Sequence, residues 1–170
     1  MDQKGEKKAV QQIIIITLAI YLLVLAVYDM KWRAIPRRWA RGGDILAYAI
    51  MTVRLAVILQ LHIKTTTKND LGILLEEIAQ IVWAASPGWI MLLMGKLAGK
   101  IGKGDGSVLF VIGSMLPASF MWGVWMLSLM LQAVAAGVLL VFSKVTGKNK
   151  IPYLPFLAGA FLILVVGGVS

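Results

Sequence analysis

The sequence contains no cysteine and only one histidine, His62, and charged residues make up just 15% of its 170 residues. Without cysteine there can be no disulfides, thiolate nucleophiles or cysteine-ligated zinc and iron–sulfur sites, and one histidine leaves little imidazole chemistry. A soluble domain carries roughly 25% charged and about 45–50% apolar residues, whereas 59% of this chain is hydrophobic. The composition therefore excludes a soluble enzyme and indicates a membrane protein, in which chemistry depends on carboxylates, amines and backbone groups.

Long uncharged stretches predict the membrane spans, because a helix needs about 20 mostly apolar residues to cross a bilayer. Five stretches of 18 to 38 residues lack Asp, Glu, Lys and Arg, except that the second contains Arg54: 9–28, 45–63, 78–95, 106–143 and 151–170. The longest is too long for one span and contains Pro117, so we expect it to divide near 117–122. The sequence thus predicts an all-α polytopic membrane protein, with six transmembrane helices in a single domain over residues 1–170.

The lysines and arginines between the spans predict the orientation, since short basic loops stay in the cytoplasm. With the N-terminus outside, the cytoplasmic loops hold 11 of the 17 basic residues and the outer segments hold five. We therefore expect both termini outside the plasma (inner) membrane. This bias and contact with anionic lipid headgroups account for the net charge of +9, so no nucleic-acid partner is expected.

Two of the eight acidic residues stand out by their position. Asp29 directly follows the first span, and Asp105 directly precedes the fourth, within the glycine-rich segment 102–106. In the predicted orientation both lie at cytoplasmic helix ends at nearly the same depth. Helix packing could bring them together, although each could also be an interfacial residue paired with a nearby cation such as Lys31.

Two carboxylates held close together can share one proton, because two like charges at short range cannot both ionise cheaply. Such a pair offers a base that activates water and an acid that protonates the leaving group. This is the chemistry of an aspartyl protease. Glycines beside Asp105, including Gly102 and Gly104, would let the backbone lie close to an extended substrate.

Three ordered segments resemble the prepilin and preflagellin peptidases, which are membrane aspartyl proteases with a GxGD motif. The first runs from Asp29 through a basic stretch to Ile35-Pro36, the second is Gly102-Lys-Gly-Asp105, and the third is Ile151-Pro-Tyr-Leu-Pro-Phe-Leu-Ala158. The resemblance implies that Asp29 and Asp105 are the catalytic pair. It also implies that the substrates are prepilin-like or archaellin-like precursors, cleaved at the cytoplasmic face after a basic leader.

The other expected site residues surround this pair. Ile35-Pro36 redirects the chain beside Asp29, and Pro152 and Pro155 shape the start of the last helix. Bifunctional members of the family have a segment with cysteine pairs and an added methyltransferase activity. Because this chain has no cysteine, we expect a peptidase alone, without a cofactor. This chain differs from the family pattern at two positions. Arg37 follows Ile-Pro where the family often has asparagine, and Ser107 stands where the family often has lysine.

Several alternatives remain for the other polar groups. Asp44 could bind the basic leader, but its place after Gly42-Gly43 favours a helix N-cap. Arg54, at the centre of a span, should face the bundle, face a polar cavity or snorkel, with a structural role favoured over one near the substrate. A metal between two acids amid so many cations is disfavoured, so no metal is expected. Rival functions are a non-catalytic part of a pilus or secretion assembly and a small proton-coupled transporter.

Overall fold

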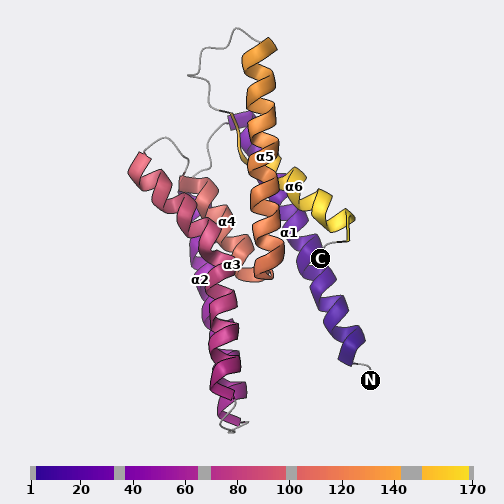
Figure 1. Ribbon diagram of the computed structural model, residues 1–170, viewed down its shortest axis with the longest axis vertical. Helices are drawn as coiled ribbons and strands as arrows, with labels where there is room; N and C mark the ends of the chain where they lie inside the picture. The colour runs from indigo at the N-terminus through magenta and orange to yellow at the C-terminus, as the bar shows by residue number, and fades with distance from the viewer. Residues whose placement is uncertain (1–2, 33–36, 65–69, 99–102, 143–150, 169–170) are drawn as a thin grey trace. The chain divides into compact units, whose positions relative to one another are not determined.

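The computed structural model describes residues 3–32, 37–64, 70–98, 103–142 and 151–168, and all regular elements in these ranges are α-helices (Figure 1). Their bounds are α1 Gln3–Trp32, α2 Arg37–Lys64, α3 Asp70–Ala98, α4 Lys103–Met115, α5 Ala118–Phe142 and α6 Leu154–Val166. The all-α prediction is therefore confirmed for the described residues. The predicted division of the long uncharged run is also confirmed, because Pro117 lies in the break between α4 and α5.

Four helices in the described residues are long and apolar enough to cross a membrane, which supports a membrane protein. These segments are Gln11–Trp32, Gly42–Gln60, Leu74–Leu97 and Ala118–Phe142. The two remaining helices, α4 and α6, are apolar but have only 13 residues each. At about 1.5 Å per residue each is about 20 Å long, less than the roughly 30 Å of a bilayer core.

The chain forms two compact units. The first comprises residues 1–35 and 123–170, and the second comprises residues 36–122. The boundary falls within α5, so its first turn belongs to the second unit and the rest to the first.

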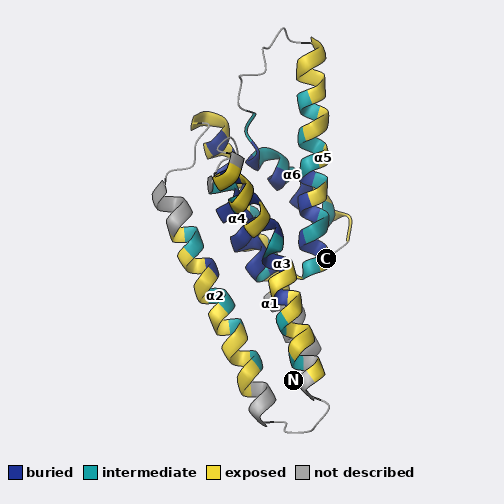
Figure 2. Ribbon diagram, turned by 60° about the vertical axis from the view of Figure 1, so that its left-hand side comes forward, coloured by how far each residue is buried: buried dark blue, intermediate teal, exposed yellow. Residues whose placement is uncertain are grey.

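In the second unit α4 packs against both α2 and α3, and its residues 106–114 are all buried (Figure 2). The contact between α3 and α4 is backbone to backbone at glycines. A Cβ on Gly88 would lie 2.6 Å from the Phe110 backbone, and one on Gly113 would lie 2.3 Å from the Ala84 carbonyl oxygen. Small residues therefore allow α4 to sit against α3 at a distance that side chains would forbid.

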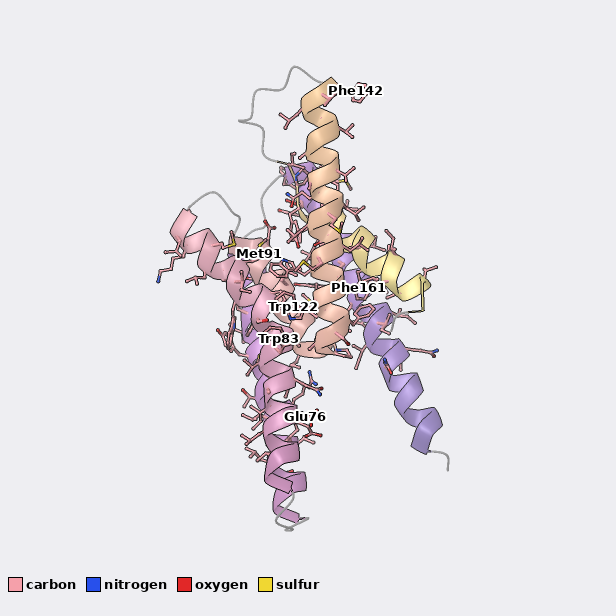
Figure 3. The ribbon with its side chains drawn as sticks, in the orientation of Figure 1. Glu76, Trp83, Met91, Trp122, Phe142 and Phe161 are labelled. Atoms are coloured by element: carbon pink, nitrogen blue, oxygen red, sulfur yellow. The ribbon has the colours of Figure 1, made fainter. Side chains whose placement is uncertain are left out.

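The helix α3 continues through Pro87 because the backbone group freed by this proline finds other partners. Proline has no N–H to donate to the carbonyl four residues earlier, which here is that of Trp83. The Trp83 oxygen instead accepts hydrogen bonds from Ser86 Oγ at 2.7 Å and Trp122 Nε1 at 3.1 Å. The two indole rings also stack, with centroids 5.0 Å apart (Figure 3). Side-chain donors thus keep a proline-containing membrane helix intact.

In the first unit α6 packs against α1, and α5 contacts α6. The buried face of α1 follows the helical repeat, with Leu18, Leu22, Leu25 and Ala26 all at most 5% exposed. On α6 the buried residues include Leu154, Leu157 and Phe161. These apolar faces form the core of the first unit. They also fix the position of Asp29, the next residue along the buried face of α1.

Candidate functional site

Asp29 lies on the buried face of α1, three residues after Ala26 and four after Leu25. It is only 6% exposed, although it is an acidic residue near the end of a long apolar helix. Burying a carboxylate away from water is costly unless hydrogen bonds compensate for the lost solvation. A partner for Asp29 is therefore required by its position.

The backbone of α6 supplies that partner. Leu154 N–H donates to Asp29 Oδ2 at 3.2 Å, across 125 residues of sequence. Leu154 is the first residue of α6, where N–H groups have no acceptor within the helix. The N-cap residue, Tyr153, makes no side-chain capping bond in the described structure, so Asp29 from another helix takes that role. A carboxylate there also interacts favourably with the positive end of the α6 dipole.

The remaining groups of the first α6 turn are also accounted for. Pro155 has no N–H, which makes proline well suited to the first positions of a helix. The N–H groups of Phe156 and Leu157 both donate to Tyr153 O, at 3.0 and 3.2 Å. Pro152 and Pro155, both expected near the site, therefore flank the residue that binds Asp29.

Tyr153 connects this helix start to α5. Its hydroxyl lies 2.7 Å from Ser128 Oγ, and both residues are buried. Ser128 Oγ also donates to the Trp125 carbonyl oxygen at 2.7 Å. This hydrogen-bonded chain holds the segment before α6 in place beside Asp29.

Replacing Tyr153 with phenylalanine removes the hydroxyl contact without removing the ring. We expect a small loss of stability, since interhelical hydrogen bonds in membranes contribute about 0.6 kcal/mol on average and at most about 1.7 kcal/mol. Unfolding in mixed detergent micelles would measure it for Tyr153→Phe, Ser128→Ala and the double variant. If the two single effects simply added, the hydroxyls would not be coupled.

In the second unit Asp105 lies in the first turn of α4 and is partly exposed. The next residue, Gly106, is buried, and a Cβ on it would lie 2.8 Å from Leu92 of α3. Gly104 precedes Asp105 and is partly exposed. Asp105 is therefore held on a helix start whose backbone rests on α3, with its own side chain partly accessible.

Asp44 is not a helix N-cap, contrary to the interpretation favoured by its sequence context. The helix α2 begins at Arg37 and runs through Gly42-Gly43, so Asp44 lies within it. Glycine in a helix costs about 1 kcal/mol relative to alanine, and packing of the following turn against α4 offsets this cost. Ala47 is fully buried there, and the Tyr48 and Phe110 rings lie 5.1 Å apart.

The contacts between α2 and α4 place Asp44 at the level of the α4 start. Tyr48 contacts Phe110, and Arg54 further along α2 contacts Ser114 further along α4, so the two helices run in the same direction. Asp44 lies one turn before Tyr48 and on the same helix face. Its Oδ1 atom is buried and has no hydrogen-bond partner among the described residues. The second unit thus holds Asp44 and Asp105 near the same end.

Each unit therefore unites part of the expected site. The first joins Asp29 to the segment containing Pro152 and Pro155, and the second holds Gly104, Asp105 and Asp44. Ile35, Pro36 and Gly102 lie outside the described residues. That Asp29 and Asp105 meet remains a prediction.

Arg54 also has a partner that the sequence did not suggest. Its Nη1 donates to the Ser114 carbonyl oxygen at 2.7 Å, near the end of α4. The last carbonyls of a helix have no intrahelical donor, so a guanidinium from α2 satisfies one of them. No group of three or more histidine or acidic side chains within the described ranges could hold a metal ion.

Comparisons of the chain with protein-family models, with curated proteins and with solved structures found no match.

Proposed function

We propose that this chain is a membrane-embedded aspartyl endopeptidase that removes the basic leader from prepilin-like or archaellin-like precursors. The observation that carries this proposal is the hydrogen bond between Leu154 N–H and Asp29 Oδ2. It joins the first and third segments of the family resemblance, which are far apart in sequence. Nothing in the motifs themselves required these two segments to touch, so their contact supports the interpretation of both as parts of one site.

The burial of Asp29 supports a functional role over a simple interfacial one. An acidic residue that merely marked the membrane boundary would face water or a neighbouring cation. Asp29 instead continues an apolar buried face and is bonded to a helix start. Asp105, the proposed second member of the pair, is partly accessible just before the buried residues 106–114 of α4, as a residue that must reach a substrate should be.

The proposed reaction is hydrolysis of one peptide bond. One carboxylate of the pair accepts a proton from water while the water oxygen attacks the carbonyl carbon, and the other carboxyl group donates a proton to the departing nitrogen. Either carboxyl group can take either role, so the two roles belong to the pair until a measurement separates them. We place both residues at the cytoplasmic face, with six helices in or partly in the membrane and both termini outside.

Metal chelation separates this mechanism from a metal-dependent one. We expect EDTA to leave leader removal unchanged, because two carboxylates and water supply all the groups that the reaction needs. The test is cleavage of a co-reconstituted precursor in proteoliposomes with and without chelator. Activity lost in EDTA and restored by Mg²⁺ or Mn²⁺ would contradict an aspartyl mechanism.

A further inference from the structure

A pocket lined by three polar and four aliphatic side chains lies between α2 and α3 within the second unit, and neither Asp44 nor Asp105 lines it. Its volume is about 390 Å³, which is within the range of small-molecule sites. Arg54, Glu77 and Gln80 line it together with four aliphatic side chains. A cation, an anion and an amide thus share one pocket on two apolar membrane helices.

The ends of the two apolar segments give the order of Arg54 and Glu77 along the helices. The end of α2 and the start of α3 are joined by residues 65–69, so both lie at the same membrane surface. Arg54 precedes the end of its apolar segment, Gln60, by six residues, and Glu77 follows the start of its segment, Leu74, by three. At about 1.5 Å per residue, Arg54 lies about 9 Å from the end of its apolar segment and Glu77 about 4.5 Å from the start of its own.

We infer that this pocket binds the headgroup of a phospholipid that carries a primary ammonium, of the phosphatidylethanolamine class. In such a lipid the phosphate lies deeper than the terminal ammonium, which is the order of Arg54 and Glu77. A guanidinium suits a phosphate oxygen, and a carboxylate accepts hydrogen bonds from an ammonium. The aliphatic side chains would contact the start of the acyl chains.

The geometry of Arg54 favours this occupant over a simple structural role. A guanidinium has five N–H donors in a planar fork, and the Ser114 carbonyl oxygen accepts from Nη1. That bond orients the planar group at the pocket wall. A charge at this depth needs further polar partners, because hydrocarbon offers none. A purely anionic lipid fits less well, since Glu77 would repel it.

Lipid retention by the purified full-length protein tests this site. We would extract it into detergent, add equal amounts of phosphatidylethanolamine and phosphatidylcholine, and count bound lipids by native mass spectrometry. The two headgroups have the same net charge, but phosphatidylcholine has no N–H to donate. We expect about a tenfold preference for phosphatidylethanolamine, the effect of about one charge-assisted hydrogen bond. Singly and doubly methylated headgroups should fall between the two.

Neighbouring glutamates provide a matched pair of variants. Glu77→Gln should abolish the preference, whereas Glu76→Gln should keep it. Glu76 is also an exposed glutamate of α3 (Figure 3), but it does not line the pocket. Arg54→Lys should retain part of the binding that Arg54→Met loses. Equal retention of the two lipids by the wild type would overturn the inference. So would equal effects of the two glutamate changes, or stronger retention of phosphatidylglycerol. The glutamate pair decides the question even if an Arg54 variant does not fold.

Discussion

Asp29→Asn and Asp105→Asn should each abolish leader removal when the variant is co-expressed with a prepilin-like precursor. Loss of a general acid or base typically lowers a rate by about 100-fold to 10,000-fold, and an amide can neither accept the proton from water nor donate one to the leaving nitrogen. Gel separation of precursor and processed protein, followed by single-turnover rates in proteoliposomes, would measure the effect.

The asparagine at position 29 is an informative choice because it separates chemistry from folding. Its amide oxygen can still accept the hydrogen bond from Leu154 N–H, so the start of α6 should be preserved. Asp29→Leu removes the acceptor as well and should destabilise the first unit in addition to inactivating it. At position 105 the lost charge at a helix start costs only about 0.3–1 kcal/mol, so this variant should also fold. Glu76→Gln is the control that keeps activity, and processing by either asparagine variant would defeat the mechanism.

Gly113→Ala should cause the largest loss of stability among the substitutions considered. The added Cβ would lie 2.3 Å from the Ala84 carbonyl oxygen, a backbone atom that can move only if α3 and α4 separate. Overpacking of this kind costs about 1–3 kcal/mol, which exceeds the cost expected for losing the Tyr153 hydroxyl. Unfolding in mixed micelles would report the change in the free energy of unfolding.

The control is the same substitution at a glycine with space around it. A Cβ on Gly137 of α5 would have no atom within 4 Å. Gly137→Ala should leave stability unchanged or raise it by up to about 1 kcal/mol, because alanine is the better helix former. Equal losses at the two positions would show that the close approach of α3 and α4 does not contribute to stability.

Where proline decides local structure, the sequence was sufficient to predict it. Pro117 predicted the break between α4 and α5, and Pro155 predicted a helix start close to where α6 begins. Both follow from the missing N–H of proline, a property of one residue. The uncharged runs likewise predicted α1, α2, α3 and α5, because solvation by lipid depends on composition.

Prediction from the sequence fails where a helix boundary or a hydrogen-bond partner depends on a second helix. Gly42-Gly43 suggested a helix boundary before Asp44, but packing of α2 on α4 carries the helix through both glycines. The Ser114 carbonyl could not have been identified as the partner of Arg54, since a backbone oxygen carries no sequence signal. The same is true of Leu154 N–H and Asp29, although a proline-marked helix start does indicate that an acceptor is needed nearby.

The most direct measurement of the central claim uses the absence of cysteine from the chain. Asp29→Cys and Asp105→Cys would be combined and treated in native membranes with a short bifunctional thiol reagent. Asp29→Cys with Leu154→Cys serves as the positive control, because those residues are in contact. We predict that the 29/105 pair cross-links within one chain as efficiently as the control. The account would be contradicted if the control cross-linked but the 29/105 pair did not, whether or not a precursor was bound.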